Sequence, residues 1–207
     1  MVQILHPITT LLCGLLAAAG TSVSAETEYR LPITVLPSHY TIRLVPYFED
    51  RNFTFDGEVE ITVNATTDAS DITLHYDDMY IIGSPTVVSL AGFQELEVVN
   101  TTYDNVTDFF KMELSETLRR GQEYLIRIKY VGILIDGEVG FYRTSYNTSS
   151  NEKRWMAVTQ FEATHARKAF PCFDEPALKA RFQVNIARTQ DYHSISNMPR
   201  ESTSEPE

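Results

Sequence analysis

The side chains best suited to chemistry stand at the end of a predicted strand. Apolar and polar residues alternate over residues 155–162, so Gln160 and Glu162 share one face of that strand. An amide and a carboxylate two positions apart form a compact acceptor pair, which suits the binding of an ammonium group. From the residues alone, a surface ion pair of Glu162 with Arg167 or Lys168 is the simpler alternative.

A short helix is predicted a few residues further along. Asp174, Glu175 and Pro176 form an acidic start that contains a proline, and Lys179 supplies a basic last turn. We therefore expect the polar pair to lie between a strand and the start of a helix.

The same stretch resembles the signature block of the aminopeptidase N-like zinc metallopeptidases, which belongs to their N-terminal domain. The block reads Thr159-Gln160-Phe161-Glu162 and then Ala169-Phe170-Pro171-Cys172-Phe173-Asp174-Glu175-Pro176. The similarity covers roughly residues 29–199, through Arg30-Leu31-Pro32, Pro37-Ser38-His39-Tyr40, Gly140-Phe141-Tyr142-Arg143, Arg154-Trp155 and Ser196-Asn197-Met198-Pro199. The sequence departs from the family pattern at Ala163, His165 and Lys168, where the family commonly has Pro, Asp or Ala, and Arg.

The resemblance implies roles for the pair. Gln160 would contact the substrate near its first side chain, and Glu162 would hold the free α-ammonium group of a peptide. An exopeptidase must fix that amine so that only the first peptide carbonyl reaches the reacting centre.

The zinc chemistry of the family is missing from these 207 residues. Family members hold zinc with two His of an HExxH helix and a later Glu, and no such motif occurs here. No two histidines have the i, i+4 spacing that would place them on one helix face; they are His6, His39, His75, His165 and His193. We therefore expect no cofactor in this chain, no catalytic residue and no activity of the chain alone.

The N-terminus has the pattern of a secretory signal peptide. Residues 1–25 contain no charged side chain other than histidine, and the apolar run Leu11–Ala19 is too short to span a bilayer. Val23, Ser24 and Ala25 supply the small residues of a cleavage site, so we expect the mature chain to begin at Glu26.

Five N-glycosylation sequons support the same compartment, at Asn52, Asn64, Asn100, Asn105 and Asn147. The formal net charge of −11 excludes a basic surface for nucleic acid and argues against attraction to anionic lipid. We expect a secreted protein, or a cell-surface one in a longer form. Any membrane association would come through parts outside these residues.

The two cysteines do not form a disulfide scaffold. Cys13 would leave with the signal peptide, which leaves Cys172 as a lone thiol. A buried, inert Cys172 is the expected state rather than a nucleophile, because no catalytic His is evident beside it.

The pattern from residue 40 to residue 195 is mostly β. Alternating runs separated by turn residues predict one all-β domain over residues 26–199, an antiparallel sandwich or curved open sheets. The runs are Tyr40-Ile42-Leu44, Val59-Ile61-Val63, Ile72-Leu74-Tyr76, Phe110-Met112-Leu114, Tyr124-Ile126-Ile128-Tyr130 and Phe182-Val184-Ile186. Residues 200–207 are polar and lack periodicity, which predicts a disordered tail.

Two functional hypotheses remain from the sequence. The first is the substrate-anchoring N-terminal domain of a secreted or membrane-associated zinc aminopeptidase, present without its catalytic domain, which would be its expected partner. The second is a non-catalytic secreted glycoprotein module that binds peptide ends or protein partners. The HExxH motif in a continuing reading frame would separate them.

Overall fold

The computed structural model describes residues 28–48 and 52–204, and nearly all of its regular structure is β-strand. The predicted signal peptide therefore lies outside the described residues. The elements are β1 (Val35–Pro46), β2 (Thr54–Ala65), β3 (Ala69–His75), β4 (Met79–Ser89), β5 (Gln94–Leu96), β6 (Val98–Asp104), β7 (Phe109–Leu118), β8 (Glu123–Ile133), β9 (Gly140–Asn147), β10 (Lys153–Gln160), the short 3₁₀ helix η2 (Ala166–Lys168) and β11 (Arg181–Ile186).

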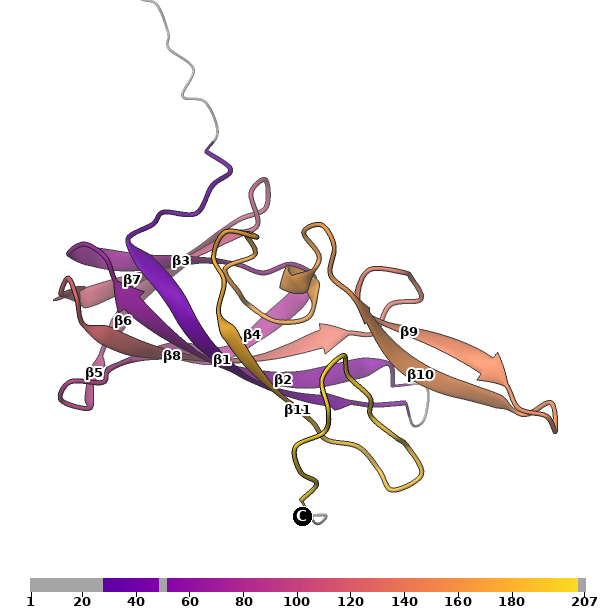
Figure 1. Cartoon of the computed structure of the whole chain (residues 1–207). Coiled ribbons are helices and arrows are strands. Elements are labelled where there is room, and N and C mark those ends of the chain that lie inside the picture. The colour runs from indigo at the N-terminus through magenta and orange to yellow at the C-terminus, as the bar shows by residue number, and fades with distance from the viewer. Residues whose placement is uncertain (1–27, 49–51, 205–207) are drawn as a thin grey trace, which may run out of the picture.

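The strands form three sheets, as shown in Figure 1. A six-stranded sheet has the order β11-β1-β2-β8-β4-β5, and a three-stranded sheet has the order β3-β7-β6. Strands β9 and β10 form a separate hairpin that projects from the body of the domain. The predicted all-β class with open sheets is confirmed. Its pairing is antiparallel except between β1 and β11, which run parallel.

The core lies between the inner faces of the two larger sheets. The period-two pattern places every second residue of β2 inside, and Val59, Ile61 and Val63 are fully buried. Ile72 of β3 and Met112 of β7 belong to the same buried cluster. The wet faces of the strands carry the polar residues, as the alternation predicts.

Two glycines let aromatic rings pack across the β2–β8 pair. Gly57 lies opposite Tyr130, and Phe55 lies opposite Gly132. A Cβ built on either glycine would come within 2.2 Å of the opposing ring. The rings therefore occupy the space that a side chain would need, which explains glycine at both positions.

Strand β11 is exposed on both faces, although its alternation predicted one wet face. Phe182, Val184 and Ile186 are 54%, 50% and 37% exposed. The strand lies at the edge of its sheet, where only β1 pairs with it, and Tyr40 stacks on Phe182 with ring centroids 4.6 Å apart. The outer edge and a large part of the apolar surface of β11 are thus uncovered by the described residues.

Two local predictions are wrong. Strand β10 ends at Gln160, so Glu162 lies in the following turn rather than on the strand, because the chain turns back through a bond from His165 N–H to the Phe161 carbonyl at 2.9 Å. No helix follows Asp174; the N–H of Leu178 closes only a single turn on Glu175.

No helix among residues 28–48 and 52–204 is long and apolar enough to cross a membrane. Residues 200–204 carry no regular secondary structure, and the rest of the predicted tail lies outside the described range.

Candidate functional site

Gln160 and Glu162 stand where the hairpin β9–β10 joins the body of the domain. Gln160 is the last residue of β10 and pairs with Gly140, the first residue of β9. Both side chains of the pair are exposed. Neither has a hydrogen bond or ion pair to another residue in the described ranges. Their acceptor atoms are therefore open to a ligand from outside.

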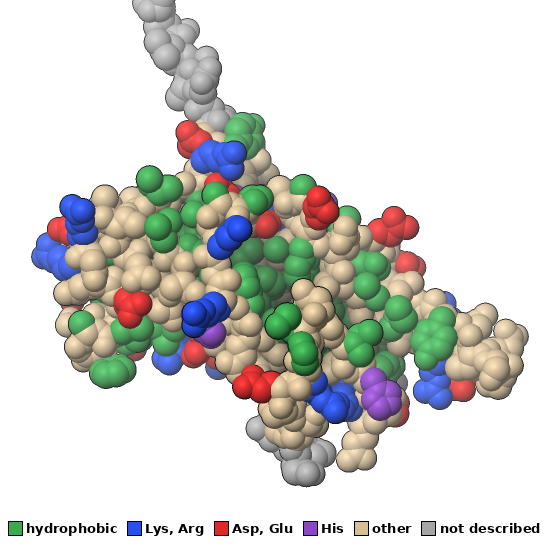
Figure 2. Space-filling model, in the orientation of Figure 1, with side chains coloured by type: hydrophobic (Ala, Val, Ile, Leu, Met, Phe, Trp, Pro, Cys, Tyr) green, Lys and Arg blue, Asp and Glu red, His purple; other side chains and the backbone are tan. Residues whose placement is uncertain are grey.

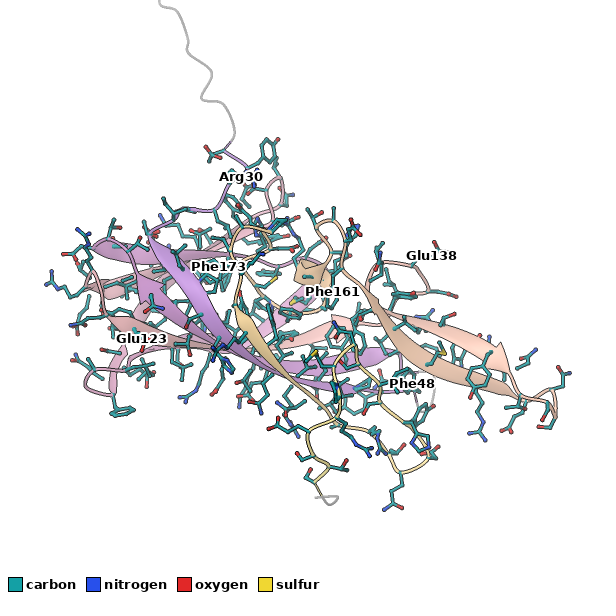
Figure 3. The ribbon with its side chains drawn as sticks, in the orientation of Figure 1. Arg30, Phe48, Glu123, Glu138, Phe161 and Phe173 are labelled. Carbon is teal, nitrogen blue, oxygen red and sulfur yellow. The ribbon has the colours of Figure 1, made fainter. Side chains whose placement is uncertain are left out.

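Phe161, between the two, explains why they point outward. Its ring packs against the core cluster, 5.8 Å from the ring of Phe170, and Figure 3 shows it at the base of the hairpin, close to η2. The inward position of Phe161 leaves Gln160, at the end of the strand, and Glu162, in the turn after it, on the exposed surface.

The simpler alternative for Glu162, a surface ion pair, is wrong. Arg167 pairs with Asp174 at 2.9 Å and with Asp108 at 3.0 Å. Lys168 pairs with Asp77 at 2.6 Å and with Asp78 at 2.5 Å. Both neighbouring cations are thus neutralised by aspartates, which leaves the Glu162 carboxylate without an internal counter-ion in the part of the chain that is described.

The rest of the signature block fixes this region to the domain. Residues 169–173 are buried, and Cys172 exchanges backbone hydrogen bonds with His75 at the end of β3. The N–H of Phe173 donates to the Tyr40 hydroxyl at 3.1 Å. Glu175 accepts from the N–H of Leu31 at 2.6 Å. The carboxylates expected to start a helix are therefore already used in tertiary contacts, which explains why no helix forms.

His75 is a buried titratable group behind the site. It is 2% exposed, and its Nδ1 accepts from the N–H of Asp174 at 3.3 Å. Burial, and to a lesser extent the nearby Arg167 charge, lower the pKa of His75 to about 4, against a smaller opposing effect of Glu175. The imidazole therefore stays neutral in the folded protein at neutral pH.

We expect His75 to make the domain sensitive to mild acid. The unfolded chain protonates this histidine near pH 6.5, whereas the folded chain resists protonation until about pH 4. The unfolded state then binds more protons, so stability is lost as the pH falls through this window, on the order of 2–3 kcal/mol. Urea unfolding at pH 7 and pH 4.5 measures the loss. His75→Asn keeps an acceptor for Asp174 and should show a smaller loss; the same loss in both proteins would contradict the assignment.

The geometry supports neither a cysteine nucleophile nor a metal site in the described residues. Burial raises the pKa of the Cys172 thiol well above its usual value, and the Asp174 charge adds to this effect, so the thiol stays protonated. The expected burial of Cys172 is confirmed. No cluster of three His, Cys, Asp or Glu suited to a metal occurs among the residues that the structure describes.

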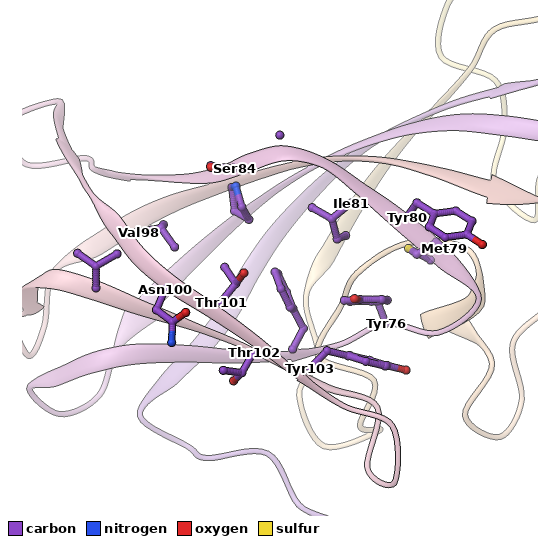
Figure 4. A pocket seen from close by; sticks show the side chains of 14 residues that line it. Tyr76, Met79, Tyr80, Ile81, Ser84, Val98, Asn100, Thr101, Thr102 and Tyr103 are labelled. Atoms are coloured by element: carbon purple, nitrogen blue, oxygen red, sulfur yellow. The ribbon is translucent and has the colours of Figure 1, made fainter.

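A cavity of about 570 Å³ lies away from the pair, between β4 and β6. Figure 4 shows its walls, with Ile81 on one side and Thr101 and Tyr103 on the other. Its lining contains no charged side chain and does not include Gln160 or Glu162. It offers no group that could hold an ammonium ion by charge.

Sequence reasoning located the pair but missed what supports it. His75, Asp77, Asp78 and Asp108 gave no signal, because their partners lie in another part of the chain. The one available hint was the adjacent cations Arg167 and Lys168 in a strongly acidic chain, which indicates ion pairs without identifying the partners.

Comparison with known families and curated proteins identifies the domain. The model of the peptidase M1 N-terminal domain matches residues 36–207. The chain is 39% identical over 192 residues to the membrane alanyl aminopeptidase of Manduca sexta and 36% identical over 188 residues to aminopeptidase N of Bos taurus. It is 35% identical over 177 residues to the thyrotropin-releasing hormone-degrading ectoenzyme of Rattus norvegicus.

Each of these alignments covers 86% of this chain but only 19%, 19% and 16% of the respective relative. The chain thus spans less than a fifth of the length of the curated relatives it matches.

Proposed function

Because the chain belongs to the peptidase M1 family through its N-terminal domain, we propose that it forms the substrate-anchoring part of a zinc aminopeptidase. The family's zinc is carried by the catalytic domain, outside the N-terminal region that matches here. The observation that supports the proposal is the exposed pair, Gln160 and Glu162, whose neighbouring cations are bound elsewhere.

The two residues would act on different parts of the substrate. The Glu162 carboxylate, free of an internal counter-ion, accepts hydrogen bonds from the α-ammonium group of a peptide. Gln160, an uncharged acceptor and donor two residues earlier, contacts the substrate near its first side chain. Fixing the amine sets which peptide bond reaches the catalytic domain, so single residues are removed from the N-terminus.

The uncovered apolar surface of β11 gives the catalytic domain a place to pack. Phe182, Val184 and Ile186 alternate with polar residues along this edge strand and remain partly exposed. Figure 2 shows apolar side chains gathered on the face of the molecule that carries β11. An exposed apolar surface of this kind is typical of an interface, and it lies on the same domain as the exposed pair.

The experiment joins the mature chain in frame to the remainder of the Manduca sexta relative, in place of its own N-terminal domain. This chimera should release the first residue from an alanyl reporter and should not cleave the N-acetylated reporter. A folded chimera that does not distinguish the two reporters, or that cleaves neither, would contradict the anchoring role.

We also propose secretion, or display at the cell surface. Two of the relatives are named as a membrane enzyme and an ectoenzyme, and the five sequons suit a glycosylated protein. After expression through a secretory pathway, the product should begin at Glu26 and its mobility should shift on glycosidase treatment. An intact Met1 with an unshifted band would contradict this proposal.

A further inference from the structure

Lys168 joins three parts of the chain around the base of the hairpin. Its ammonium group bonds to Asp77 and Asp78 in the connection between β3 and β4. Its aliphatic stem lies on the backbone of Gly140, since a Cβ built on that glycine would come within 2.5 Å of the Lys168 Cβ. We call Lys168, Gly140, Asp77 and Asp78 the lysine clamp.

The backbone of Gly140 is suited to this contact. Its φ of +74° is in the left-handed region that other residues rarely adopt, and the missing side chain leaves room for the lysine stem. The side chains of Lys168 and Asp77 are 21% and 27% exposed, so their ion pair is shielded from water more than one at the open surface, whereas Asp78 lies farther out. Burial alone would lower the pKa of Lys168, but its hydrogen bonds to Asp77 and Asp78 outweigh this effect and raise the pKa.

The clamp acts on the strand position that carries Gln160. Gly140 and Gln160 are the last pair of the β9–β10 register, and Glu162 follows two residues later. The hairpin has no strand partner in either larger sheet among the described residues. At the next position of β9, Phe141 packs on Phe55 with ring centroids 4.9 Å apart, and the N–H of Arg143 bonds to the Ile135 carbonyl at 2.9 Å. The hairpin is therefore held by these contacts of β9 and, at the end nearest the pair, by the lysine clamp.

We propose that Lys168 is a positioning residue, which holds the base of the β9–β10 hairpin so that Gln160 and Glu162 meet the amino end of a peptide at the correct place. The inference rests on the proposed function of the pair. Lys168 itself does not touch the substrate; its charge is used by two aspartates of the domain. Loss of the clamp should weaken substrate binding without removing any reacting group.

The first test replaces Lys168 by methionine in the chimera, which keeps the stem and removes the charge. We expect kcat/KM on the alanyl reporter to fall about tenfold, mainly through a higher KM, because the reacting groups are unchanged. Lys168→Arg can still pair with both aspartates and should recover most of the loss. The matched control is Lys111→Met, which also breaks ion pairs with two carboxylates, Asp71 and Glu113, but on the three-stranded sheet.

Thermal melting of each variant separates positioning from folding. A merely structural lysine would lower the melting temperature in Lys168→Met and leave KM unchanged at temperatures well below the transition. That result, or an equal rise in KM in Lys111→Met, would overturn the proposal.

The second test combines Lys168→Met with Glu162→Gln. If the lysine acts through the pair, Lys168→Met should cost less than about twofold in kcat/KM once the carboxylate is gone, so the two losses are not additive. Additive losses would overturn the positioning role and leave the anchoring role intact. An unchanged kcat/KM in Glu162→Gln alone would instead contradict the proposed function itself.

Discussion

Glu162→Gln should lower kcat/KM of the chimera about ten- to a hundredfold, because a hydrogen bond between an ammonium and a carboxylate contributes roughly 1.5–3 kcal/mol. The substitution keeps the shape of the side chain and removes its charge. Glu162 is exposed and its neighbouring cations are bound to aspartates. The loss should therefore reflect the substrate contact rather than a broken internal ion pair.

Whether KM or kcat changes will show whether the Glu162–ammonium contact strengthens in the transition state. A higher KM with unchanged kcat means that Glu162 holds the ground state and the transition state equally, whereas a lower kcat means that the bond strengthens in the transition state. Gln160→Ala removes no charge, so it should change the preference among first residues more than the overall rate.

The matched control is Glu138→Gln, an exposed glutamate in the loop before β9, which Figure 3 shows near the hairpin. It should stay within about twofold of the parent, since it removes the same charge from the domain surface without touching the site. An equal loss in Glu138→Gln would show that the loss comes from the changed net charge of the domain surface rather than from a contact with the substrate. An unchanged kcat/KM in folded Glu162→Gln would show that the carboxylate does not anchor the substrate.

The core strands could be predicted because their alternation is complete. Val59, Ile61 and Val63 on β2, and Ile126 and Ile128 on β8, are fully or almost fully buried, since each strand has one face on the core and one in water. Hydrophobic burial alone fixes the register of such strands.

Four strands did not give a clear alternation in the sequence: β4, β5, β6 and β9. The pairing of β4 with β8 is interrupted between Ile82 and Thr86, where Gly83 and Pro85 disturb the alternation. Strand β6 is exposed over nearly its whole length, so it has no buried face to reveal its period. Strand β9 pairs with β10 rather than with a larger sheet, which weakens its signal, whereas the alternation of β10 was recognised.

The region that carries Gln160 and Glu162 could be predicted from the sequence. The tertiary contacts that support it could not. Gln160 lies on the strand that the alternation indicated, whereas Glu162, expected on the same strand, lies in the turn after it, beside the inward-packed Phe161. The ion pairs behind it join residues 59 and 90 positions apart. No local spacing encodes such contacts, because they exist only after the sheets have assembled.

Arg167→Met should destabilise the isolated domain by about 3–5 kcal/mol. This is the largest loss of stability that we expect from removing one partly buried charge. The guanidinium group bonds to Asp174 and Asp108, and the exposed fractions of the three side chains are 11%, 11% and 27%. Methionine has a similar length but cannot neutralise these carboxylates. Two partly buried negative charges would then remain without their common partner.

Chemical denaturation of the parent and variant domains measures the change at pH 7. Arg119→Met is the control, because Arg119 and its partner Asp68 are 66% and 56% exposed, and such exposed pairs contribute little to stability. Adding Asp108→Asn and Asp174→Asn to Arg167→Met should recover part of the loss, since no unpaired charge is then left beneath the block. Equal stability of Arg167→Met and Arg119→Met would show that Asp108 and Asp174 are solvated well enough without the arginine.

Full recovery of stability in the triple variant would assign the whole loss to the unpaired carboxylates rather than to the packing of the arginine stem.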